Sequence, residues 1–201
     1  MRFRALTAVS ALTALTFLGT VPMAQAADSS APASNTGVKI RKPTPELARA
    51  IDAARTKAAG SGPALQTAHV LCYQAHTRNA GWSAILCTDG APGFTGTTGH
   101  NDPIDRVVFW VGGGLDFNTQ LHWANDGTSQ GFHVASGDGL ELWNTHGNAL
   151  EAIRLWSSND LMKAAAHVQN VGWKGTDRWS PDQWIGSIGE ARWMEAFWVA
   201  V

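Results

Sequence analysis

Three histidines and three acids recur in step along the chain, and together they could carry out general acid–base chemistry. Each histidine is followed 28 or 29 residues later by an acid that begins an apolar run, in the pairs His76 with Asp105, His122 with Glu151 and His167 with Glu195. An imidazole and a carboxylate within reach of a substrate can move its protons. A catalytic site would normally occur once, whereas a structural device recurs with its unit.

The surroundings of these six residues favour the structural interpretation. Each histidine alternates with apolar neighbours and each acid lies inside an apolar strand. Half-buried imidazoles and carboxylates need partners, and each can serve the other. We therefore predict no catalytic residue in this set. We expect each histidine to contact the acid of its own unit or of the next one, so that the first strand of a unit is fastened to the last.

The histidines belong to a longer motif that the chain repeats. His-x-x-Asn-x-Gly-Trp occurs at 76–82 and 167–173, and 122–128 keeps all of it except the Trp, which Thr128 replaces. The histidines are 46 and 45 residues apart. Asparagine two residues before glycine is typical of a tight turn, which assigns a structural role to Asn79, Asn125 and Asn170. The motif thus defines three units of about 45 residues, at about 66–112, 113–158 and 159–201.

The pattern within the units predicts an all-β domain over 65–201. Short runs of β-forming residues alternate with Gly, Asn-Asp or Ser-Pro turns. One unit alone would have too little core and too many exposed edges, so three like units predict a closed pseudo-threefold domain. We favour a β-prism of three sheets, because each unit ends in a long unbroken strand and no Gln-x-Trp signature is present. The alternative is a β-trefoil.

The repeated motif resembles the clostridial hydrophobic-Trp repeat (ChW) of secreted bacterial proteins. The matching stretches are 166–173, the Gly-Thr-Thr-Gly turn at 96–99 and the Met-Glu-Ala strand start at 194–196. The first and third units match well, while the middle one has lost its Trp and most of its Gly-Thr turn. The resemblance implies a secreted or surface-exposed module that binds polysaccharide or protein at a cell surface. It implies no defined chemistry.

The N-terminal third of the chain lacks the repeated strand pattern. Residues 1–26 have a basic start, an apolar run too short to span a bilayer and a final Ala-Gln-Ala, which is the pattern of a secretory signal peptide. Residues 27–64 read as a flexible leader that contains one helix at 45–59, with Thr44 as its N-cap and Pro45 in its first turn. We therefore expect a secreted, extracellular protein without membrane insertion.

The two cysteines of the chain, Cys72 and Cys87, are predicted to form a disulfide, because an even number of cysteines in an exported chain indicates pairing. The seven histidines show no metal-binding spacing, and no Gly-x-Ser-x-Gly elbow occurs. We therefore predict no metal, no cofactor and no enzyme activity. His100 and His146 stand at equivalent positions beside a turn, and we include them as candidate ligand contacts, although solvated loop histidines are more common.

Tryptophans give the strongest functional signal in the sequence. Trp82 and Trp173 recur with the motif and are predicted to lie in the core, and Trp184 aligns with Phe94 and Leu140 as one apolar position. Four others lack an aromatic counterpart in the other units and are candidates for an exposed site: Trp123, Trp143, Trp179 and Trp193. Exposed indoles stack on sugar rings. The same four could instead fill asymmetric gaps or cover the N-terminal helix.

The charge content of the chain excludes some classes of binding partner. Only 15% of the residues are charged and the formal net charge is −1, without the basic face that nucleic acids or anionic membranes require. The sequence favours a secreted, non-catalytic module that binds extracellular or cell-surface polysaccharide, with one preferred site in the Trp-rich third unit. A protein-interaction or inhibitor module is the alternative, and a hydrolase with its site between units is less favoured.

Overall fold

The computed structural model describes residues 35–60, 69–88, 93–176 and 178–201. The predicted signal peptide, the start of the predicted leader and residues 61–68 lie outside this part of the chain. No helix among the described residues has the length and apolar character needed to cross a membrane.

The prediction of an all-β fold with one helix is confirmed: the strands form three antiparallel sheets. The first sheet has the order β1-β10-β6-β2-β3, with β4 also on β2, and consists of β1 (Thr36–Arg41), β10 (Gly139–Asn144), β6 (Ile104–Gly112), β2 (Val70–Thr77), β3 (Gly81–Trp82) and β4 (Leu86–Cys87). The second has the order β14-β11-β7-β8, with β9 also on β7, and consists of β14 (Asp182–Gly186), β11 (Leu150–Trp156), β7 (Phe117–Trp123), β8 (Gly127–Thr128) and β9 (Phe132–Val134). The third has the order β13-β12-β15-β5 and consists of β13 (Gly172–Gly175), β12 (Lys163–Val168), β15 (Met194–Ala200) and β5 (Thr95–Gly96).

Each sheet contains one strand from the next unit of the repeat, where the first unit follows the third. We call this the borrowed strand. The pair that forms the centre of each sheet, β2 with β6, β7 with β11 and β12 with β15, comes from a single unit. The borrowed neighbours are β10 beside β6, β14 beside β11 and β5 beside β15. The first unit thus contributes β5 to the third sheet, which closes the cycle. This exchange links the three sheets, while the choice between prism and trefoil geometry stays a prediction.

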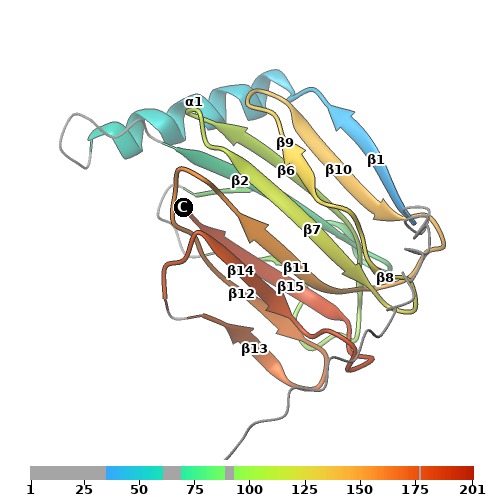
Figure 1. Cartoon of the computed structure of the whole chain (residues 1–201). Coiled ribbons are helices and arrows are strands. Elements are labelled where there is room, and N and C mark those ends of the chain that lie inside the picture. The colour runs from blue at the N-terminus through green and yellow to red at the C-terminus, as the bar shows by residue number, and fades with distance from the viewer. Residues whose placement is uncertain (1–34, 61–68, 89–92, 177) are drawn as a thin grey trace, which may run out of the picture. The chain divides into compact units, whose positions relative to one another are not determined.

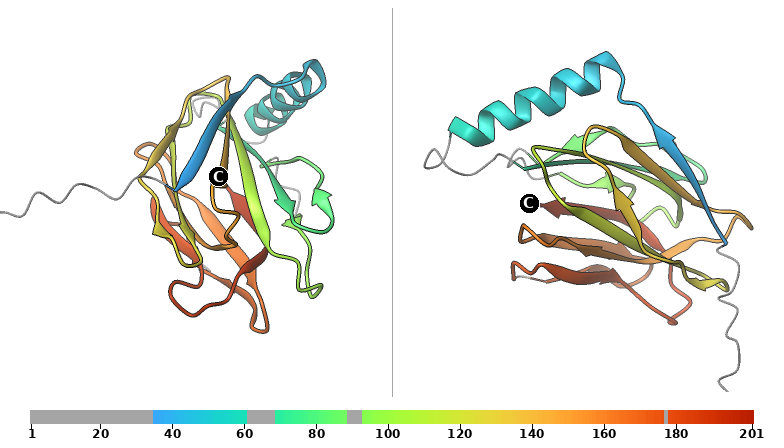
Figure 2. Two further views of the ribbon diagram at one scale, coloured as in Figure 1. Left: turned by 90° about the vertical axis from the view of Figure 1, so that its right-hand side faces the viewer. Right: turned by 45° about the horizontal axis from the view of Figure 1, so that its top comes forward.

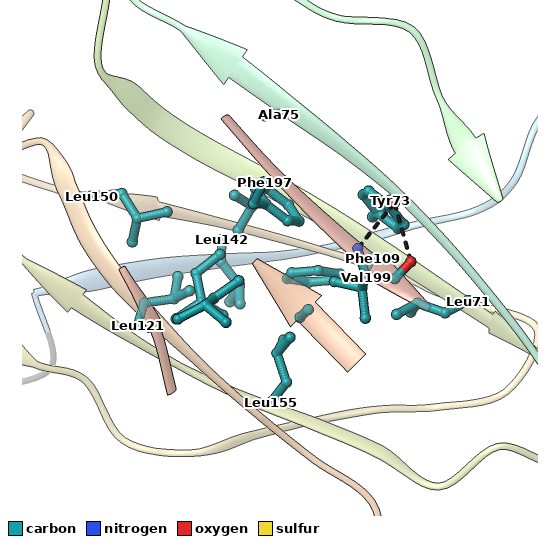
Figure 3. Close-up of a cluster of buried hydrophobic side chains, with 14 of the residues drawn as sticks. Leu71, Tyr73, Ala75, Phe109, Leu121, Leu142, Leu150, Leu155, Phe197 and Val199 are labelled. Atoms are coloured by element: carbon teal, nitrogen blue, oxygen red, sulfur yellow. Dashed lines mark hydrogen bonds between the residues drawn. The ribbon is translucent and has the colours of Figure 1, made fainter. Parts of the chain in front are cut away.

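The inner faces of the three sheets share one hydrophobic core. Leu71 and Phe109 of the first sheet, Leu121 and Leu155 of the second and Phe197 of the third are buried in the same cluster (Figure 3). Tyr73 joins the first sheet to the third, because its hydroxyl donates to the Val199 carbonyl at 3.2 Å and accepts from the Val199 amide at 3.1 Å. Burial raises the pKa of this phenol, although the contact with Val199 opposes the shift.

The prediction of an unstructured leader is wrong for residues 36–41, which form β1 on the edge of the first sheet. β1 pairs with β10 from Thr36↔Asn144 to Arg41↔Gly139 (Figure 1). The strand forms because an open sheet edge offers unpaired backbone groups. Its side-chain contacts add to this pairing: Arg41 Nε lies 2.6 Å from Oε2 of buried Glu141.

The helix α1 (Pro45–Gly60) starts where the capping residues predict, and Thr44 Oγ1 accepts a hydrogen bond from the Leu47 amide at 3.2 Å. The helix lies over the outer face of the first sheet (Figure 2), and its thin apolar stripe packs there. The predicted disulfide is confirmed in the same cluster, where Cys72 on β2 is bonded to Cys87 on β4. Helix and disulfide together cover this face of the first sheet.

The first Asn-x-Gly turn is held by a buried acid that the motif does not contain. Asp102 is 3% exposed and accepts hydrogen bonds from the backbone amides of Asn79 at 2.9 Å and Ala80 at 3.0 Å. Burial acts to raise the pKa of its carboxyl, but the hydrogen bonds outweigh burial and hold the pKa below its usual value.

This pKa shift gives Asp102 a pH-dependent stabilising effect. A carboxyl whose folded pKa is depressed stabilises the fold above its unfolded pKa of about 3.9, and this contribution is lost as the pH falls through the folded value. Asp102→Asn should therefore lower the free energy of unfolding by about 1–2 kcal/mol at neutral pH, and by less near pH 3. Urea denaturation at both pH values measures this, with Asp52→Asn on the exposed face of α1 as the control. Equal losses for Asp102→Asn at the two pH values would contradict the assignment.

Candidate ligand-binding face

The outer faces of the three sheets differ in what covers them. On the first sheet, Val70, Cys72, Val108 and Trp110 are buried beneath the apolar stripe of α1. On the second sheet, the Arg154 guanidinium forms two hydrogen bonds to the Asp182 carboxylate and lies 5.0 Å from the centre of the Trp156 ring. Contact with Asp182 raises the pKa of Arg154 and lowers that of Asp182. Among the described residues, neither a covering helix nor such a network lies across the aromatic side chains of the third sheet.

The third sheet carries aromatic side chains above a floor of small residues. Ala165 on β12 and Ala196 on β15 are buried although they face away from the core. Trp173 of β13 and Phe94, just before β5, meet edge to face across this floor, with ring centres 5.4 Å apart. Trp198 occupies the β15 position opposite Phe94, since Phe197 pairs with Thr95. Small side chains leave room for the rings to lie across the strands, so burial of the alanines follows from the aromatic layer.

These aromatic side chains line a groove of about 880 Å³ at the end of the third sheet. Trp179 forms another part of its wall and is 53% exposed. The remaining wall comes from the first sheet, from residues between β4 and β5 and from the end of the chain at β15: Tyr73, Cys87, Thr88, Gly93, Val199, Ala200 and Val201. We call this groove, with all of these lining residues, the aromatic groove. No charged side chain of the described residues lines it, so it suits an uncharged ligand with flat apolar faces.

The predicted contacts between histidine and acid are present in all three units. His76 Nδ1 lies 2.7 Å from Asp105 Oδ1, and His167 Nδ1 lies 3.0 Å from Glu195 Oε2. In the middle unit the imidazole uses its other nitrogen, with Nε2 3.4 Å from Glu151 Oε2 and Nδ1 2.8 Å from Thr128 Oγ1. Each acid belongs to the same unit as its histidine. Each pair joins the first strand of its unit to the last.

The prediction that Trp82 and Trp173 lie in the core is wrong, because their exposed fractions are 38% and 45%. Each is the cross-strand neighbour of the motif histidine, and neighbours across a pair lie on the same face of a sheet. Since the histidines face outward, the indoles do too. They meet the imidazoles edge to face at 5.1 and 5.4 Å. Trp82 is further covered by Arg41, 5.5 Å from its ring centre, while Trp173 lines the aromatic groove.

Of the four tryptophans predicted to form an exposed site, only Trp179 lines the groove. Trp123 is 1% exposed, and Trp143 is half-buried against Gly37 of β1, where a Cβ atom would come within 2.2 Å of the ring. Trp193 is half-buried, and its Nε1 has no hydrogen-bond partner among the described residues. The prediction of exposure therefore fails for Trp123, and neither Trp143 nor Trp193 lines the groove.

The two turn histidines are exposed but do not line the groove. His146 Nδ1 lies 3.2 Å from Asp126 Oδ1. Burial acts to raise the pKa of Asp126, but hydrogen bonds from Asn144, Asn148 and His146 outweigh it and lower the pKa. Among the described residues, no cluster of three or more His, Cys, Asp or Glu side chains could hold a metal ion.

Most of the groove residues, including Phe94, Trp173 and Trp198, were not among the ligand-binding candidates from sequence. The alignment of Trp184 with Phe94 and Leu140 is also off by one residue in the middle unit. Strand pairing places Glu141 opposite Val108, which is the position that Trp184 holds opposite Arg154. The outward-facing alanines at 165 and 196 are the signal that could have located the groove, because strand alternation places them on the same side as His167.

The fold and the site define a three-sheet β domain that presents one open aromatic face. The family model "Clostridial hydrophobic W" (ChW) matches residues 167–201, which include β12 from His167 onward, all of β13 to β15 and three of the groove's aromatic residues. Repeats of this family occur in extracellular and cell-wall-associated proteins. No curated protein and no solved structure matches the chain.

Proposed function

We propose that this protein is a secreted, non-catalytic module that binds an uncharged polysaccharide in the aromatic groove of the third sheet. The observation that carries the proposal is the groove itself, with Phe94, Trp173, Trp179 and Trp198 in its wall and no charged side chain of the described residues beside them. Sugar rings present flat C–H faces that stack on indoles. A charged polymer would find no counter-charge among the described residues that line the groove.

The repeat pattern and the processing signals support the rest of the proposal. All three units place a histidine against the acid of the final strand and exchange one strand in a cycle, so we regard them as three ChW repeats, the middle one diverged. The signal-peptide pattern of residues 1–26 and the disulfide between Cys72 and Cys87 fit export into an oxidising compartment.

Replacing Trp179 by alanine should weaken polysaccharide binding about 30-fold, the effect of losing a contact worth about 2 kcal/mol. A glycan array and pull-down on insoluble polysaccharides identify the polymer, and tryptophan fluorescence titration measures affinity. Trp184→Ala is the matched control, because Trp184 is an exposed indole on the second sheet outside the groove. Its affinity should equal that of the unmodified protein.

Three results would contradict the proposal in different ways. Equal losses for Trp179→Ala and Trp184→Ala would remove the groove as the site. Capture of a protein from culture supernatant, without any response to sugars, would favour the protein-interaction alternative. Turnover of a polysaccharide that is lost in His167→Ala but not in His76→Ala would instead identify a hydrolase.

A further inference from the structure

A second, polar cavity of about 400 Å³ lies beside the aromatic groove, where two units of the repeat meet. Asn101 and Gly99 come from the Gly-rich turn of the first unit, and His167, Gln169, Asn170 and Glu195 come from the third. The cavity exists because β5 of the first unit is the borrowed strand of the third sheet. The turn after β5 is thereby placed against the Asn-x-Gly turn of the third unit.

The polar side chains of this cavity are already positioned by one another. Gln169 donates from Nε2 to Asn101 Oδ1 at 2.6 Å. Glu195 Oε2 accepts from the Gly99 amide at 3.1 Å and contacts His167 Nδ1 at 3.0 Å. Groups fixed before binding lose little entropy on binding. Carboxamides both donate and accept, so they suit hydroxyl groups, and Asn170 forms no side-chain hydrogen bond to any other described residue.

The cavity and the aromatic groove share a wall. His167 lines the cavity, Trp173 lines the groove, and their rings meet edge to face with centres 5.4 Å apart. A chain that stacks on the groove's indoles therefore reaches the carboxamides by passing the Trp173 edge. The combination of a flat apolar surface with adjacent hydroxyl-binding groups matches the two kinds of surface that a sugar chain presents.

The equivalent position in the first unit is blocked. Arg78 stands where the third unit has Gln169, and its guanidinium donates to the Gly147 carbonyl, which joins the two facing turns. Arg41 of β1 lies over Trp82, the counterpart of Trp173. In the second unit, Ala124 replaces Gln169 and Thr128 replaces the tryptophan. Among the described parts of the three units, the third alone combines an exposed indole that no arginine covers with the carboxamides of Asn101 and Gln169.

We propose that this polar cavity is a second subsite of the same binding site, so that the ligand is a saccharide chain long enough to occupy cavity and groove together. The proposal rests on the function proposed above. It specifies the ligand further, as an extended chain whose affinity increases with length, with hydroxyl groups of one sugar held by Asn101, Gln169 and Asn170.

A double variant, Asn101→Ala with Gln169→Ala, tests the second subsite. Both alanines already occur at the equivalent positions of other units: Ala191 has φ 52° where Asn101 has φ 55°, and Ala124 stands in place of Gln169. The variant should therefore fold normally, which its melting temperature checks. The probes are neutral cello- and chito-oligosaccharides, from disaccharide to hexasaccharide, titrated by tryptophan fluorescence and calorimetry.

In the unmodified protein, affinity should rise about tenfold between the shortest and the longest chain that binds, and the double variant should lose this gain while binding the shortest chain as before. Trp179→Ala should weaken binding of every chain length. Equal affinity of the double variant and the unmodified protein for all lengths would overturn the second subsite and leave the groove standing. If neither the unmodified protein nor any variant bound any of the oligosaccharides, both the second subsite and the proposed function would be overturned.

Discussion

Replacing Trp123 by alanine is expected to lower the free energy of unfolding by about 4 kcal/mol, the largest effect of any single change considered for this protein. Trp123 is among the largest fully buried side chains and belongs to the shared core of the three sheets. Its Nε1 donates to Thr36 Oγ1 on β1 at 2.9 Å. Truncating a buried tryptophan leaves a cavity and costs about 3–5 kcal/mol.

Urea denaturation followed by circular dichroism measures this loss. Trp123→Phe keeps most of the buried volume but lacks the indole donor, so it should cost less, about 1–2 kcal/mol. Trp179→Ala is the matched control, because the same truncation on an exposed ring should change stability by less than about 0.5 kcal/mol. Equal stability of Trp123→Ala and Trp179→Ala would show that Trp123 is not a core residue.

Trp123 also shows why sequence alone misplaced part of the site. Trp123 does lack an aromatic counterpart in the other units, but the reason is its contact with β1. The apolar–basic alternation of β1 is only four residues long, at 38–41. Thr36 accepts from Trp123, and Gly37 lies on Trp143, so these asymmetric tryptophans match an asymmetric strand. Strand pairing at a sheet edge depends on what that edge offers. Residues 36–41 carry no local pattern that reveals their distant partner.

The all-β architecture and the contacts between histidine and acid could be predicted because they recur. Spacing alone identified His76, His122 and His167 with their acids, since a half-buried imidazole and carboxylate satisfy each other wherever the unit is repeated. That a residue recurs in each unit does not indicate whether it faces the core or the solvent. Trp82 and Trp173 recur because each is the neighbour of a histidine across a strand pair, and both are exposed.

The groove illustrates a second limit of prediction from sequence, because its residues come from more than one unit. Trp173 and Trp179 lie in one unit, but Phe94 arrives on a strand borrowed from the first unit. The exchange of β5, β10 and β14 between sheets is a property of the closed cycle, and no local stretch encodes it. We predicted the preferred site in the Trp-rich third unit, and of its two candidate tryptophans, Trp179 and Trp193, only Trp179 lines the groove. The composition of the site still required knowledge of which units meet.

His167→Ala should lower the free energy of unfolding by about 3 kcal/mol, because it leaves a buried charge without its principal partner. The Glu195 side chain is 3% exposed, and among the described residues Oε2 would retain only the Gly99 amide. Removing one partner of a buried pair costs about 3–5 kcal/mol. His76→Ala is the matched control. The Asp105 side chain is 21% exposed and can be hydrated when its histidine is lost, so the cost should be about 1 kcal/mol.

A double-mutant cycle separates loss of the contact between imidazole and carboxylate from loss of packing. If the unpaired carboxylate causes the damage, His167→Ala combined with Glu195→Ala should be more stable than the sum of the two single losses predicts, by about 1–2 kcal/mol. Urea denaturation of the four proteins at neutral pH gives this coupling. Strict additivity would mean that His167 acts through packing against Trp173 alone. The histidine would then support the wall between groove and cavity without fastening β12 to β15.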